Sequence, residues 1–168
     1  MKVLLWILLT FSLSVYLSAQ DLKSYTRGSA TLYYEESGAG PPLYILSGGP
    51  GEAPYYPYRQ LADSLKSFYT CIVVHQRGSG MSTIPINSQT ITIDNYTQDL
   101  EALRNVRGDK QVTLLGVSWG GLLAMNYAAN FPDRVSDLIL VCSAPPSYTV
   151  WNVLFDNQYA RRSKPELD

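Results

Sequence analysis

One short stretch, residues 116–120, constrains the fold of this chain more than any other. It reads Gly-Val-Ser-Trp-Gly and joins an apolar, strand-like run at 111–115 to a helix-like run at 122–129. A serine between glycines at such a junction predicts a tight turn, because glycine allows close backbone approach without steric cost. The turn would expose Ser118 at the carboxyl end of its strand, where open α/β sheets bind ligands. Ser118 is therefore the candidate nucleophile of an acyl-transfer reaction.

Strand-like and helix-like runs alternate along the chain. Apolar or alternating runs predict strands at 29–36, 43–46, 70–74, 111–115 and 135–141. Helical spacing predicts helices at 58–67, 94–107 and 122–129. Asp94 is the expected N-cap of the second helix, and Gly108 is its expected stop. This alternation predicts an α/β fold, with a mostly parallel sheet and flanking helices.

Composition excludes several classes of function. The chain has 168 residues, a formal net charge of −1 and 46% hydrophobic residues, which suits one globular domain. It has no basic block, so nothing indicates a nucleic acid as partner. It also has no cysteine–histidine cluster for zinc, no carboxylate set for calcium and no phosphate loop. We therefore expect neither a metal nor a cofactor.

The N-terminus has the pattern of a secretory signal peptide. Residues 1–20 combine a short positive start, an apolar run from Val3 to Leu17 and small or polar residues before Asp21. The run is short for a stable membrane span, although an uncleaved anchor remains the alternative. The pattern predicts export to the periplasm or the medium, with a mature chain that starts near residue 21.

Four motifs together resemble the proline iminopeptidase branch of the α/β-hydrolase fold. They are the Gly-Gly-Pro-Gly loop at 48–51, the Gln-Arg-Gly loop at 76–82, the helix segment 95–104 and the serine turn at 116–121. The likeness covers about residues 28–150. It implies that residues 21–147 are the N-terminal part of a hydrolase domain and that 148–168 begin a helical cap, with the C-terminal strands absent.

The resemblance also assigns site residues. Ser118 would be the nucleophile, and the backbone N–H groups of Gly49 and Trp119 would form the oxyanion hole. Loop and turn support would come from Gly48, Pro50, Gly51, Gly116, Gly120 and Arg77. Arg77 is expected to order its loop by donating to backbone carbonyls. The chain departs from the family pattern at Ser47 and His75, where relatives carry histidine and aspartate.

The acid and base of the expected catalytic triad are missing. In this fold they follow the serine along the chain, in the order serine, acid, histidine. The only histidine here is His75, which precedes Ser118. The family's strand order puts its strand two places from that of Ser118, or about 10 Å away, beyond the reach of a base. We interpret His75 as a loop residue bonded to nearby backbone, and we expect little turnover from this chain alone.

Other polar residues have structural interpretations. Asp99 and Glu101 are expected in surface or structural pairs, whereas Asp133 and Asp137 lie at the wrong end of their elements to be the triad acid. Cys71 and Cys142 belong to strands three places apart in the family, about 14 Å, which is too far for a disulfide. Both cysteines are therefore predicted to be buried free thiols.

The sequence thus predicts an exported serine hydrolase that releases an N-terminal proline, or another residue, from peptides through an acyl-enzyme on Ser118. One alternative is a secreted esterase or amidase of the same fold. The other is a non-catalytic half-domain that binds a partner or is complemented by a second chain. The exact substrate and the oligomeric state are left open at this point.

Overall fold

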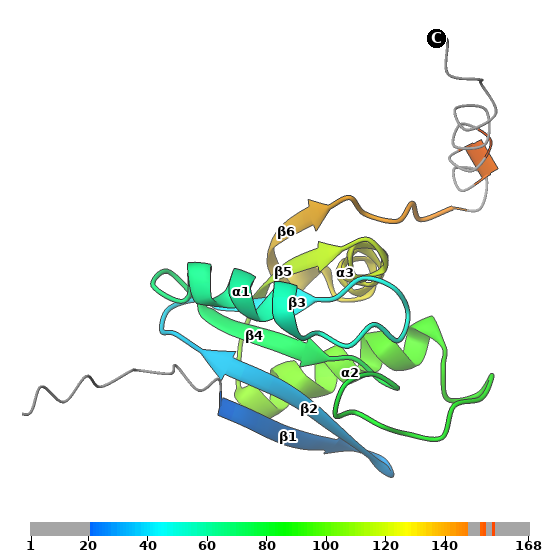
Figure 1. Cartoon of the computed structure of the whole chain (residues 1–168), viewed down its shortest axis with the longest axis horizontal. Helices are drawn as coiled ribbons and strands as arrows, with labels where there is room; N and C mark the ends of the chain where they lie inside the picture. The colour runs from blue at the N-terminus through cyan, green and yellow to red at the C-terminus, as the bar shows by residue number, and fades with distance from the viewer. Residues whose placement is uncertain (1–20, 148–151, 154–155, 157–168) are drawn as a thin grey trace, which may run out of the picture.

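The computed structural model describes residues 21–147, 152–153 and 156, and it shows a six-stranded sheet between two layers of helices (Figure 1). In chain order the elements are β1 (Asp21–Arg27), β2 (Ala30–Ser37), β3 (Pro42–Leu46), α1 (Tyr56–Leu65), β4 (Thr70–His75), α2 (Ile93–Arg107), β5 (Val112–Val117), α3 (Trp119–Asn130), a 3-10 turn (Pro132–Arg134) and β6 (Val135–Val141). The alternation of strands and helices read from the sequence is confirmed.

The strand order in the sheet is β1-β2-β4-β3-β5-β6. The four strands β4, β3, β5 and β6 run parallel to their neighbours, whereas β1 pairs antiparallel with β2 and β2 antiparallel with β4. The predicted α/β class with a mostly parallel sheet is therefore confirmed. β3 lies between β4 and β5, as expected, so the strands that end at His75 and at Val117 are two places apart.

The two faces of the sheet bury different side chains. On β3, Leu43 and Ile45 pack with α1, whereas Tyr44 and Leu46 belong to the larger cluster formed with α2 and α3. All four side chains are at most 1% exposed. The continuous apolar run of β3 thus reflects burial on both faces, which is typical of central parallel strands.

The structure corrects several element boundaries. β1 was not predicted, although Gly28, with φ +60, and Ser29 form the two-residue turn of a β1–β2 hairpin. α1 begins at Tyr56 rather than at residue 58, and it ends at Leu65. The N-cap of α2 is Thr92, whose side chain accepts from the Asn95 N–H, and not Asp94, which lies in the first turn. The C-terminal stop at Gly108 is confirmed by its left-handed backbone, φ 72.

β6 forms the second edge of the sheet, opposite β1 (Figure 1). Four of its apolar side chains are 38–42% exposed among the described residues, namely Leu138, Ile139, Leu140 and Val141. The predicted signal peptide at 1–20 lies outside the described residues, and so does nearly all of the predicted cap segment at 148–168. Of the helices that the structure describes, none is long and apolar enough to cross a membrane.

Candidate active site

Ser118 lies at the junction between β5 and α3, in a backbone conformation that residues other than glycine rarely adopt. Its φ is 51° and its ψ is −113°, and it caps the N-terminus of α3. Its N–H donates to the Val141 carbonyl at 3.0 Å, and its own carbonyl accepts from the Ala144 N–H at 2.8 Å. The β6 strand and the residues after it therefore hold the turn in place. Ser118 is exposed, as a nucleophile must be.

The glycines on either side of Ser118 are required by close contacts. A Cβ on Gly116 would lie 2.3 Å from the Gly120 carbonyl oxygen, so β5 and α3 touch backbone to backbone. A Cβ on Gly120 would lie 2.2 Å from the carbonyl oxygen of Leu46 on β3. Neither position has room for a side chain. The supporting role predicted for Gly116 and Gly120 therefore has a steric basis.

The Gly48–Gly51 loop after β3 lies directly beside the serine. A Cβ on Gly48 would be 3.5 Å from Ser118 Cβ, and the Gly48 N–H is already bonded to the Tyr58 hydroxyl at 2.7 Å. Gly49 follows with φ +43 and is exposed, and Pro50 and Gly51 complete a turn closed by the Glu52 N–H on the Gly49 carbonyl at 3.0 Å. Since the Gly48 N–H is occupied, Gly49 remains the predicted oxyanion donor in this loop.

Trp119 opens α3, so its backbone N–H belongs to the first turn, where helix N–H groups have no intrahelical partner. The positive end of the helix adds to the potential that favours an oxyanion there. The predicted donors, Gly49 and Trp119, thus come from the two segments that meet at Ser118. Removing one such donor typically costs about 10²–10³ in rate.

Gln76 ties these two segments together, which the sequence analysis did not foresee. Its side-chain oxygen Oε1 accepts from the Trp119 indole N–H at 3.1 Å, and its side-chain Nε2 donates to the Ser47 carbonyl and hydroxyl oxygens, each at 2.9 Å. Ser47, the departure from the family pattern, is fully buried, and its hydroxyl donates to the Glu52 carbonyl at 3.1 Å. The Gln-Arg-Gly motif was noticed in the sequence, but only the fold shows which segments its glutamine links.

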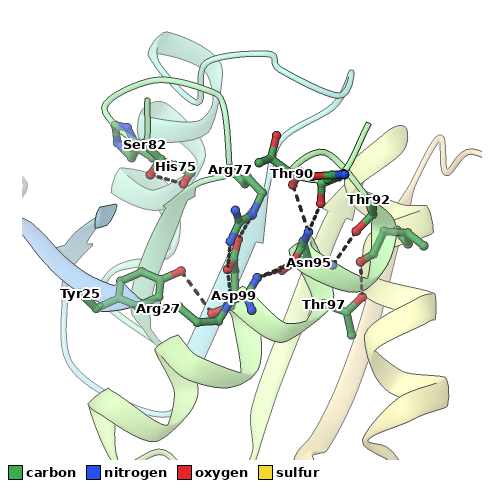
Figure 2. Close-up of polar contacts among 12 residues, drawn as sticks. Tyr25, Arg27, His75, Arg77, Ser82, Thr90, Thr92, Asn95, Thr97 and Asp99 are labelled. Atoms are coloured by element: carbon green, nitrogen blue, oxygen red, sulfur yellow. Dashed lines mark hydrogen bonds and ion pairs between the residues drawn. The ribbon is translucent and has the colours of Figure 1, made fainter. Parts of the chain in front are cut away.

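Arg77 orders its loop by a different contact from the one predicted. Instead of donating to backbone carbonyls, its guanidinium pairs with the carboxylate of Asp99 on α2, at 2.7 Å and 2.6 Å (Figure 2). Arg27 from the end of β1 donates to the same carboxylate at 2.5 Å, and the Tyr25 hydroxyl donates to the Asp99 carbonyl. Asp99 is only 4% exposed, so of the two interpretations offered for it, structural pairing is correct.

His75 is the last residue of β4 and is buried, so its assignment to a loop was wrong. One ring nitrogen, Nδ1, accepts from the Met81 N–H at 3.0 Å, the nearby backbone contact that was expected. The other, Nε2, lies 3.0 Å from a carboxylate oxygen of Glu35 on the neighbouring strand β2. Both nitrogens are thus engaged away from Ser118, and His75 is not placed to act as its base.

Glu35 is the centre of this second buried cluster. Burial raises the pKa of its carboxyl, but hydrogen bonds from His75 and Arg59 outweigh that effect and lower the pKa to about 2. Arg59 comes from α1, and two of its guanidinium nitrogens donate hydrogen bonds to the Glu35 carboxylate. The cluster therefore links α1 to the antiparallel part of the sheet.

Of the remaining predictions about polar residues and cysteines, some are confirmed and one is wrong. Cys71 is a buried free thiol as predicted, whereas Cys142 is free but exposed, which corrects the expectation of burial. Asp133 lies in the 3-10 turn at the far end of α3, away from Ser118. Among the described residues, no three His, Cys, Asp or Glu gather where they could hold a metal ion.

A recess of about 330 Å³ lies along the first turns of α1, and its lining residues are separate from the candidate site. It is lined by Tyr55, Tyr56, Arg59, Gln60 and Asp63, none of which belongs to the serine turn or to the Gly48–Gly51 loop. We therefore centre the candidate site on Ser118 rather than on this recess.

Known proteins are similar in sequence to this chain over much of its length. The match to the family described as the alpha/beta hydrolase fold covers residues 41–164. The cis-3-alkyl-4-alkyloxetan-2-one decarboxylase of Shewanella oneidensis is 36% identical over 118 residues, which are 69% of this chain and 36% of that protein. A proline iminopeptidase of Xylella fastidiosa is 37% identical over 111 residues, 65% of this chain and 35% of that protein. The chain thus spans about a third of these relatives' length.

Solved structures agree with the sequence comparison. The proline iminopeptidase-related protein of Thermus thermophilus is 31% identical, with a TM-score of 0.68 over 74% of this chain and 45% of that chain. A mutant epoxide hydrolase of Vigna radiata has a TM-score of 0.71 over 89% of this chain and 50% of that chain, but at 22% identity it shares the fold alone. The resemblance read from four sequence motifs is confirmed.

Proposed function

The chain belongs to the α/β-hydrolase family, and from that premise we propose that it provides the nucleophile and the oxyanion hole of a serine hydrolase. Ser118 would attack the carbonyl of an amide or ester and form an acyl-enzyme, and the N–H groups of Gly49 and Trp119 would stabilise the oxyanion. No metal or cofactor takes part in this chemistry.

The observation that carries this proposal is the backbone of Ser118. A non-glycine residue at φ 51, exposed at the end of a parallel strand and at the start of a helix, is held there by two backbone hydrogen bonds. Such strained conformations persist where function requires them. The Gly48–Gly51 loop lies alongside, and the site of a Cβ on Gly48 would be 3.5 Å from Ser118 Cβ. This contact supports the proposal that the nucleophile and the oxyanion donors act on the same carbonyl group.

As substrates we propose peptides with a free N-terminal proline or another N-terminal residue. The support is the proline iminopeptidase name of relatives that are 36–37% identical to this chain. A relative of similar identity is named as an oxetanone decarboxylase, so family membership alone does not select the substrate. A secreted esterase or amidase is the second candidate, because the same nucleophile and oxyanion hole serve esters equally well.

Proton transfer is the part of the reaction for which the described residues provide no group. His75 is the only histidine of the 168-residue sequence, and both of its nitrogens are engaged. We therefore expect this chain to react slowly, retaining only the contributions of binding and of the oxyanion hole. In a serine protease those terms alone leave about 10³–10⁴-fold acceleration over water.

A fluorophosphonate probe tests the proposed nucleophile. The 168-residue chain is incubated with the probe, digested and mapped by mass spectrometry, beside Ser118→Ala and Ser143→Ala; Ser143 is a nearby serine in the segment that follows β6. Slow labelling of Ser118 that persists in Ser143→Ala and disappears in Ser118→Ala supports the proposal. Labelling that survives in Ser118→Ala refutes it.

A panel of proline amides and short esters then separates the two candidate substrates. Faster release from proline amides favours the peptidase, and faster release from esters favours the esterase. Turnover at ordinary enzyme rates would refute the expectation that this chain lacks a base. A chain that takes neither label nor substrate would fit the third hypothesis, a non-catalytic binding module.

We further propose that the protein is exported, on the pattern of residues 1–20. Expression with a C-terminal tag and N-terminal sequencing of the mature chain would test this. A new N-terminus near residue 21 is expected, and a cytoplasmic chain that keeps Met1 would refute export.

A further inference from the structure

One carboxylate lies beside the candidate nucleophile and has no part in the chemistry described so far. It belongs to Glu52, which closes the turn after Gly51. The site of a Cβ on Gly48 is 2.9 Å from Glu52 Oε2 and 3.5 Å from Ser118 Cβ. Glu52 Oε2 and Ser118 Cβ are therefore at most about 6.4 Å apart. Glu52 Oε2 also lies 4.0 Å from the site of a Cβ on Gly49, the predicted oxyanion donor.

Tyr58 holds the carboxylate in this place. The Tyr58 hydroxyl accepts from the Gly48 N–H at 2.7 Å and donates to Glu52 Oε2 at 3.2 Å. Burial raises the pKa of Tyr58, and the nearby Glu52 carboxylate raises it further, so the hydroxyl keeps its proton and remains a donor. Glu52 itself is exposed, so its carboxylate remains open to a ligand in the site.

A fixed negative charge at this distance discriminates among substrates. Acyl transfer develops negative charge on the carbonyl oxygen, and a carboxylate within a few ångströms opposes that charge. A substrate with a cation close to its scissile carbonyl would form an ion pair with the Glu52 carboxylate. That pairing would offset the repulsion between the carboxylate and the oxyanion. A neutral or anionic substrate gains no such pairing.

We propose that Glu52 is a specificity-determining residue, whose carboxylate binds a protonated amine next to the carbonyl that Ser118 attacks. This rests on the proposed function of Ser118 and narrows it to substrates with a free amino group at the acyl residue. Glu52 is not the general base in this scheme, because its Oε2 already accepts a hydrogen bond from Tyr58. Among the described residues, no hydrogen bond joins Glu52 to Ser118.

The test is binding to the 168-residue chain labelled with ¹⁵N. Prolinamide, which carries a protonated amine at neutral pH, is compared with N-acetylprolinamide, which has the same ring and amide but no charge. The shifts of the Gly48, Gly49 and Ser118 amides report binding. The variant is Glu52→Gln, which keeps the size and the acceptor for Tyr58. The matched control is Asp133→Asn, an exposed carboxylate at the far end of α3.

The wild-type chain and Asp133→Asn should bind prolinamide about fivefold more tightly than N-acetylprolinamide, the upper range for an ion pair at an exposed site. Glu52→Gln should bind the two equally. The proposal is overturned if wild type shows no preference, if it binds neither ligand, or if Glu52→Gln keeps the preference.

Fluorophosphonate labelling of the same proteins separates this proposal from the one on which it rests. Labelling of Ser118 without an amine preference leaves the nucleophile in place and removes the role of Glu52. An amine preference that depends on Glu52, in a chain whose Ser118 takes no label, leaves the amine site in place and removes the proposed hydrolase chemistry.

Discussion

Replacing Ser118 by glycine should stabilise the fold while it removes the candidate nucleophile. At φ 51 and ψ −113 a side chain is strained, and such strain costs about 1–3 kcal/mol. Glycine relieves it but loses about 0.5–1 kcal/mol through the greater freedom of the unfolded chain. At the middle of both ranges the net gain over alanine, which keeps the Cβ, is about 1 kcal/mol. For a chain of this size that raises Tm by about 2–4 °C.

Thermal unfolding of Ser118→Gly and Ser118→Ala, followed by circular dichroism, measures this difference. Both variants lack the hydroxyl, so the comparison isolates the backbone. The same pair at Ser64, an exposed residue of the regular helix α1, is the control, and there glycine should be about 0.5–1 kcal/mol less stable than alanine. If Ser118→Gly were no more stable than Ser118→Ala, the turn would not be strained and the reasoning would be wrong.

Two further predictions concern buried carboxylates. Asp99→Asn should cost about 3–5 kcal/mol in urea unfolding, because it leaves the guanidinium groups of Arg77 and Arg27 without their anion, whereas Asp63→Asn, in an exposed pair, should cost no more than about 1 kcal/mol; equal costs would contradict the assigned network. The pKa of Glu35 is lowered to about 2, so its carboxylate stabilises the fold above pH 4.5 and loses that effect as the pH falls towards 2. The stability gap between wild type and Glu35→Gln should therefore shrink by up to about 3 kcal/mol over that range, and a gap independent of pH would show that the carboxylate is not specially stabilised.

The sequence was informative wherever a local rule decides the structure. The tight turn at Ser118 follows from the glycines at 116 and 120, and the structure shows that a Cβ at either position would strike backbone atoms. The stop of α2 follows from Gly108 in the same way, because the helix ends in a left-handed residue. Continuous apolar runs located the central strands, because strands buried on both faces have no polar side to alternate with.

Contacts between distant segments were beyond that kind of reasoning. Asp99 is 22 residues from Arg77 and 72 from Arg27, and no local pattern distinguishes a buried partner from a surface charge on an amphipathic helix. β1 was missed because its burial is mostly slight and its pairing depends on β2 rather than on its own apolar content. Its one local signal was the Gly28–Ser29 pair, which favours a two-residue hairpin.

The arrangement of these contacts explains how a strained serine can be kept in place without a histidine beside it. Four segments converge on the turn. β6 fixes the Ser118 amide, the Ala144 N–H fixes its carbonyl, and Gln76 joins the Trp119 indole to Ser47 at the base of the Gly48–Gly51 loop. These contacts determine the conformation independently of any proton acceptor. We therefore expect the turn at Ser118 to keep its conformation in this chain whether or not a proton acceptor lies beside it.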